Sequence, residues 1–198
     1  MRYGVLGLMA LLALGGCARV AYLPTARYIL EPAPEVALVQ CSNLALGIRP
    51  LVPEQPYNQR VLYRADAYQV DYYANAQWAE MPRDVVTRAV TDALIATERF
   101  KDVGNAADMR MPDMVLTGQL RAFDENRTTD PWTAECEVRL ELRKGLNRDS
   151  AWAATMKVSE PMDTNDLPGL AAAMSRAVAR VAQQAAAEVA SIGFENEM

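Results

Sequence analysis

The strict alternation of residues 132–144 constrains the fold of this chain more than any other feature. The segment WTAECEVRLELRK points Ala134, Cys136, Val138, Leu140 and Leu142 to one side and Glu135, Glu137, Arg139, Glu141 and Arg143 to the other. A period of two is typical of a β-strand with one buried and one solvated face. The sequence therefore predicts an antiparallel sheet that is wet on one side.

Further segments repeat this alternation on either side of the first. Residues 113–123 and 151–161 alternate in the same way, and the stretches between them carry turn residues, so a three-stranded meander is expected. Upstream, residues 27–32 and 43–52 are predicted as short strands. Residues 60–73 are predicted as a hairpin that turns near Ala65-Asp66, and the alternation continues from Tyr68 to Trp78.

Two segments have the apolar spacing of helices. The first begins at Pro82, which suits the first helical position, and is predicted to continue through Phe100. The second is rich in alanine and spans 170–192. Two helices can cover one face of a sheet, so the predicted fold is a two-layer α+β domain over residues 28–198, with a mostly antiparallel sheet and two helices on one face.

The segment AYQVDYYANAQWAEMPRD, residues 67–84, concentrates three tyrosines and a tryptophan. Its even-numbered residues are mainly apolar, so Tyr68, Tyr72 and Trp78 are predicted to face the interior. Tyr73 breaks the alternation and is predicted to point outward. Tyr73 and Gln77, with the strand edge beside them, are therefore the candidate contacts for a protein partner.

The N-terminus has the composition of a lipoprotein signal. One basic residue and an apolar run precede Leu14-Gly15-Gly16-Cys17, which resembles the bacterial lipobox. Residues 1–16 are then a cleaved signal peptide, Cys17 carries the covalent lipid, and 17–27 form the tether. Two or more acyl chains give stable membrane anchoring. An ordinary signal peptide with an unrelated cysteine is the alternative.

Several kinds of chemistry are missing from the sequence. The chain has no histidine, which removes the commonest general base and the usual zinc ligand, so we predict no enzyme, no metal site and no cofactor besides the lipid on Cys17. The carboxylates of Asp124-Glu125 and of Asp163 and Asp166 are interpreted as solvated turn residues. The formal net charge of −5 argues against a nucleic-acid partner.

Two cysteines follow the lipobox. A disulfide between Cys41 and Cys136 is compatible with an oxidising compartment. The alternative for Cys136, which occupies an inward strand position, is a small buried hydrophobe.

The segment 61–103 resembles the ABC-type transport auxiliary lipoprotein family, whose members include the lipoprotein of the paraquat-inducible lipid-transport operon. The resemblance rests on the pair Tyr63-Arg64, on the tyrosine-bearing strand, and on Trp78-Ala79-Glu80 before the helix that Pro82 begins. RYIL at 27–30, the lipobox and the closing alanine-rich helix also fit, whereas Met81 departs from the small residue or proline expected there.

The resemblance implies an accessory role without catalytic residues. Family members work with an ABC permease and ATPase and with a periplasmic Mce-domain protein to move phospholipid or other hydrophobic molecules. By the same resemblance, Ala18 after the lipid-bearing cysteine favours the periplasmic face of the outer membrane. The chain would dock there, with a homo-oligomer among the expected assemblies.

Two alternatives remain at the level of the sequence. One is a lipid carrier that holds an acyl chain in a cavity between the sheet and the helices. The other is a purely structural envelope lipoprotein.

Overall fold

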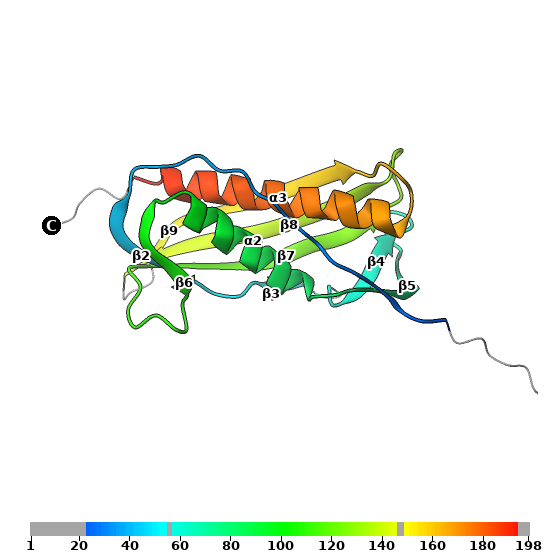
Figure 1. Cartoon of the computed structure of the whole chain (residues 1–198), viewed down its shortest axis with the longest axis horizontal. Helices are drawn as coiled ribbons and strands as arrows, with labels where there is room; N and C mark the ends of the chain where they lie inside the picture. The colour runs from blue at the N-terminus through cyan, green and yellow to red at the C-terminus, as the bar shows by residue number, and fades with distance from the viewer. Residues whose placement is uncertain (1–22, 55–56, 146–148, 194–198) are drawn as a thin grey trace, which may run out of the picture.

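The computed structural model describes residues 23–54, 57–145 and 149–193. Within these ranges the chain forms one sheet and two helices (Figure 1). The elements in chain order are β1 (Ala26–Tyr28), β2 (Ser42–Ile48), β3 (Val52–Pro53), β4 (Arg60–Arg64), β5 (Val70–Trp78), α2 (Pro82–Ala96), β6 (Phe100–Asn105), β7 (Met114–Asn126), β8 (Thr133–Lys144), β9 (Asp149–Pro161) and α3 (Leu167–Ser191).

The predicted meander forms one side of the sheet, with β9 at the edge. β7 pairs antiparallel with β8, and β8 pairs antiparallel with β9, along nearly their whole lengths. The inward residues of β8 are those that the alternation predicts, and each of them is at most 1% exposed. The meander and its buried face are therefore confirmed.

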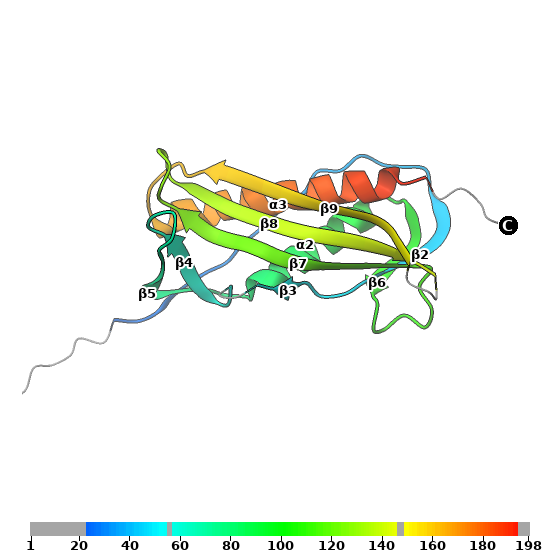
Figure 2. The same cartoon turned by 180° about the vertical axis from the view of Figure 1, so that it is seen from behind.

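The other edge of β7 is shared by three short strands. β2 pairs with β7 at Met114–Leu116, β3 pairs at Gln119 and Leu120, and β4 pairs at Glu125 and Asn126. All three pairings are parallel, so the sheet is mixed. β5 and β1 extend the sheet beyond β4, and β6 extends it beyond β2. The two groups lie at opposite ends of the long axis (Figures 1 and 2).

Both helices pack on one face of the sheet, and the opposite face carries no helix (Figures 1 and 2). The inward stripe of α3 includes Met174, Val178 and Val181, each with 0% exposure. The predicted two-layer α+β fold is confirmed. None of the helices in the described residues is long and apolar enough to cross a membrane.

The first helix is shorter than predicted. The N–H of Thr97 donates to the carbonyl of Ala93, and Glu98 then adopts a φ of 55°. This left-handed conformation ends the helix, because a residue with positive φ cannot continue a right-handed turn. Phe100, predicted as the last helical residue, instead begins β6, with its side chain 6% exposed.

The aromatic run is only partly interior. Ala76 and Trp78 are each 3% exposed, as the alternation predicts, but Tyr68 is 100% exposed and Val70 is 49% exposed. The prediction that Tyr68 faces the interior is therefore wrong. The reason is that Tyr68 lies in the turn between β4 and β5, outside the paired strands, where the alternation has no buried face to match.

Strand β7 continues past its predicted end. A register shift between Leu120 and Ala122 changes which residues face the helices, and the strand then runs on to Asn126. Asp124 and Glu125 are consequently 1% and 0% exposed. They are not solvated turn residues, and this correction bears directly on the candidate sites.

Candidate functional site

The two described cysteines do not form a disulfide. Both thiols are free, with Cys41 exposed and Cys136 buried. Burial raises the pKa of the Cys136 thiol to about 12. Cys136 is therefore a small buried hydrophobe, which was the alternative to the disulfide. Cys17, the predicted lipidation site, lies outside the described residues.

Tyr73 does not point outward as predicted. Its hydroxyl donates to Oε2 of Glu125 at 2.6 Å, and its ring packs edge-on against Tyr63 with 5.3 Å between centroids. Burial, with the hydrogen bond to Glu125, raises the pKa of the Tyr73 hydroxyl above its ordinary value. The ring remains partly exposed, so Tyr73 is chiefly a structural residue.

Gln77 does not lie beside an open strand edge. The residue is partly buried, and its backbone is registered with Arg27 of β1 on one side and Arg60 of β4 on the other. β1 therefore occupies the edge that the sequence left free. Its residues Ala26 and Arg27 come from the segment predicted as tether.

The buried carboxylates at the end of β7 each have their own partners. Glu125 accepts a hydrogen bond from Arg127 Nε at 2.5 Å, and the Arg127 guanidinium lies 3.6 Å above the centroid of the Tyr63 ring. Asp124 accepts hydrogen bonds from Arg64 Nη2 at 3.1 Å and from the hydroxyl of Tyr57 at 3.2 Å.

This arrangement does not make an acid/base pair. Asp124 and Glu125 are consecutive strand residues, so their side chains leave opposite faces of the sheet. Burial raises the pKa of Asp124, and the neighbouring Arg64 opposes that rise. The two clusters fasten β4 and β5 to β7. In the part of the chain that the structure describes, no group of three or more potential ligands could hold a metal ion.

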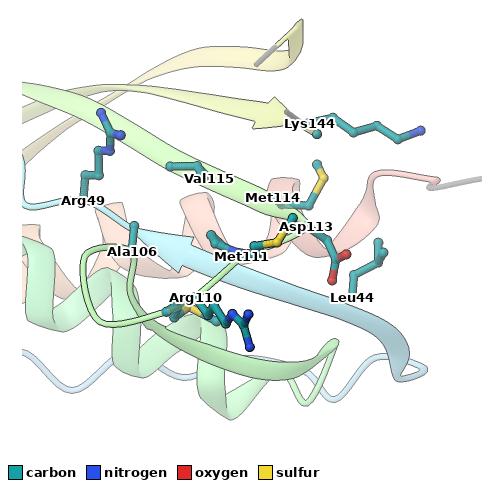
Figure 3. A pocket seen from close by; sticks show the side chains of 12 residues that line it. Leu44, Arg49, Ala106, Arg110, Met111, Asp113, Met114, Val115 and Lys144 are labelled. Atoms are coloured by element: carbon teal, nitrogen blue, oxygen red, sulfur yellow. The ribbon is translucent and has the colours of Figure 1, made fainter. Parts of the chain in front are cut away.

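A pocket of about 520 Å³ lies at the other end of β7, under the segment that connects β6 to β7 (Figure 3). The apolar part of its lining includes Leu44, Met109, Met111, Met114 and Val115. Met114 is 1% exposed, whereas Met111 is 69% exposed. We call this site the methionine pocket.

Charged side chains surround the methionine pocket. Arg49, Arg110 and Lys144 come from three different parts of the chain, and Figure 3 shows them extending in different directions from the apolar centre. The guanidinium groups of Arg49 and Arg110 have no ionic partner among the described residues. The carboxylate of Asp113 also lines the pocket, so the charged lining has three basic side chains and one acidic one. An apolar centre with a net basic rim suits a protruding apolar group flanked by negative charge.

A side-chain hydrogen bond and a close approach at a glycine position the segment above the pocket. Oδ2 of Asp113 accepts the N–H of Ala45 at 2.7 Å, which ties the segment to β2. A Cβ atom on Gly47 would lie 2.9 Å from Cβ of Ala106 and 3.1 Å from Cβ of Pro112, so only glycine allows this close approach. Our sequence analysis missed the pocket, although three methionines in DMRMPDM are a signal for an adaptable apolar surface.

The space between the sheet and the helices is filled. Val138 and Leu140 of β8 and Met174 and Val178 of α3 belong to one core cluster, and all four residues are at most 1% exposed. Close packing of this kind gives no support to an acyl-chain cavity at that interface.

Several solved structures share this fold. The Xanthomonas campestris protein XCC0632 shares 18% identity at a TM-score of 0.75, over 83% of this chain and 94% of its own. An uncharacterised protein shares 11% identity at a TM-score of 0.68, over 84% and 99%. The hypothetical protein CT253 from Chlamydia trachomatis shares 9% identity at a TM-score of 0.57, over 78% and 100%. These likenesses concern the fold alone.

The sequence itself identifies the family. A comparison with curated proteins found no match. The family model described as "ABC-type transport auxiliary lipoprotein component" matches residues 28–186, which is most of the chain and includes both helices except the last residues of α3. The chain therefore belongs to the ABC-type transport auxiliary lipoprotein family.

Proposed function

We propose that this protein is a non-enzymatic docking component of an Mce-type ABC system, anchored by acyl chains on Cys17 to the periplasmic face of the outer membrane. The system would move phospholipid or other hydrophobic molecules across the envelope. The family match over residues 28–186 carries the proposal. The lipobox and the absence of histidine support the anchor and the accessory role.

The shape of the domain suits this role. Leu23 lies six residue steps after Cys17, so that stretch spans at most about 20 Å. The described chain begins at the end of the molecule that holds β1 and β5 (Figure 1). β7 has 13 residues and extends about 40 Å toward the opposite end. The anchor thus holds the end of the domain with β1 and β5 close to the membrane, and the long axis can stand on the membrane or lie along it.

Lipidation of Cys17 is tested by metabolic labelling with an alkyne analogue of palmitate. We expect the wild-type protein to carry the label and Cys17→Ala to lose it completely, because the thiol is the only acylation point proposed. Cys41→Ala is the matched control and should keep the label. In a density gradient the labelled protein should sediment with outer-membrane markers, and recovery with inner-membrane markers would contradict the proposed location.

Docking is tested by affinity purification of the tagged protein from detergent-solubilised envelope. We expect an Mce-domain protein or an ABC component to co-purify well above an untagged control. Gln77→Ala tests the proposed contact on β5, since Gln77 is partly accessible and its substitution leaves the core unchanged. If no transport component is enriched with the wild-type bait, the docking function is wrong.

A further inference from the structure

The hairpin between β4 and β5 presents an isolated aromatic side chain. Tyr68 is 100% exposed, and Oδ1 of Asp66 accepts the N–H groups of Tyr68 and Gln69, each at 2.8 Å. The N–H of Ala65 also donates to the carbonyl of Gln69 at 3.0 Å, which closes the turn. We call residues 65–71 the tyrosine tip. Its backbone is fixed before any partner arrives, and such preorganisation lowers the cost of binding.

The tyrosine tip is acidic. Asp66 and Asp71 flank Tyr68, and neither carboxylate has an ionic partner among the described residues. Val70 adds a second apolar side chain, 49% exposed. The tip is therefore an apolar projection with negative charge on both sides.

The tip and the methionine pocket lie at opposite ends of β7. Arg64, the residue before the tip, is registered with Asn126 at the end of β7, whereas Met114 at its start lines the pocket. Twelve residue steps separate these two β7 positions, about 40 Å at the rise of a strand. One molecule cannot place its own tip in its own pocket, so the two surfaces can meet only between molecules.

We infer that the methionine pocket of one copy of this chain receives Tyr68 of a second copy. The two surfaces match in shape and in charge: a pocket with Arg49 and Arg110 on its rim meets an aromatic projection flanked by Asp66 and Asp71. Tyrosine buried in a pocket is a frequent centre of protein interfaces, with charged residues around it. Thioethers also contact aromatic rings favourably.

The contact joins two different surfaces. Each copy offers one tip and one pocket, so further contacts close a pair or a ring of copies, or extend an open row. Anchoring of every copy to one membrane is compatible with these arrangements when the long axes lie along the membrane surface. The inference concerns self-association and does not depend on the proposed transport partner.

Cysteine cross-linking of the full-length protein in its own membrane tests the contact. Two differently tagged copies are co-expressed, one with Tyr68→Cys and the other with Met111→Cys, both in a Cys41→Ser background. Mild oxidation should give a species that carries both tags. The control pair combines Tyr68→Cys with Leu38→Cys, because Leu38 is 72% exposed but lies outside the pocket. We expect the control yield to be lower by at least about tenfold, as loss of a central contact weakens an interface by that factor or more.

Charge reversal separates recognition from chance collision. Arg49→Glu in the pocket copy should lower the cross-linking yield, and Asp71→Lys in the tip copy should restore it. Absence of the doubly tagged species, an equal yield from the control pair, or no rescue by charge reversal would each overturn the inference. If nothing cross-links but Arg49→Glu abolishes co-purification of a transport component, the pocket serves a different protein and the inference fails while the proposed function stands.

Discussion

Arg127→Met is expected to destabilise the protein by about 3–5 kcal/mol, the usual cost of removing one partner from a buried ion pair. Glu125 has 0% side-chain exposure, and Arg127 Nε lies 2.5 Å from its Oε1. Methionine keeps most of the volume of the arginine stem but leaves the carboxylate without its counter-charge. Of the two hydrogen bonds described for Glu125, only the one from Tyr73 remains. Urea denaturation followed by far-UV circular dichroism measures the change.

Arg88→Met is the matched control for this prediction. Arg88 Nη1 lies 2.6 Å from Glu80 Oε1, about as close as Arg127 to Glu125, but the two side chains are 48% and 41% exposed. Exposed ion pairs contribute about 0–1 kcal/mol, so this variant should be nearly as stable as the wild type. Because the two ion pairs have similar distances, the difference in stability between the two variants measures the effect of burial.

A double variant makes the cause explicit. Arg127→Met combined with Glu125→Gln removes the charge that arginine neutralised, so it should recover a substantial part of the lost stability. A double variant less stable than Arg127→Met alone would show that Arg127 acts mainly through its contacts with Tyr63 and Trp132, and not through Glu125.

The sequence predicts the long, regular elements of this fold well. The apolar periodicity extends over 12 residues in β8 and over 25 residues in α3. Such local periodicity is the most direct sequence signal of secondary structure. The signal peptide, Cys17 and the tether depend on a motif, and they stay predictions that labelling can test.

The remaining strands depend on partners that the local sequence does not specify. β2, β3 and β4 are short and pair with β7, which lies at least 50 residues later in the chain, so only the three-dimensional arrangement shows that they are parallel. Asp124 and Glu125 look like turn residues because their composition is that of a turn. Their burial depends on Arg64 and Arg127, whose approach no local pattern predicts.

The methionine pocket and the tyrosine tip were missed for the same physical reason. Each is built by a connection between strands, where no periodicity applies. Tyr68 and Trp78 occupy equivalent positions in the same alternating pattern. Tyr68 is exposed and Trp78 is buried because the turn includes Tyr68 and ends before Trp78.

The last prediction therefore compares these two aromatics. Trp78→Ala should cost about 3–5 kcal/mol, because Trp78 is 3% exposed and packs edge-on against Phe123 with 5.6 Å between ring centroids. Tyr68→Ala should change stability by less than about 0.5 kcal/mol, because its side chain has no buried contacts to lose.

The measurement is urea denaturation at a protein concentration where the chain is monomeric, since self-association would add stability by mass action. A loss for Tyr68→Ala comparable to that for Trp78→Ala would mean that Tyr68 packs against the domain, as the alternation predicts. It would then be unable to reach a second copy. We expect stability to depend on Trp78 and not on Tyr68, and cross-linking to depend on Tyr68. These results together would show that one aromatic run supplies both a core residue and a surface contact.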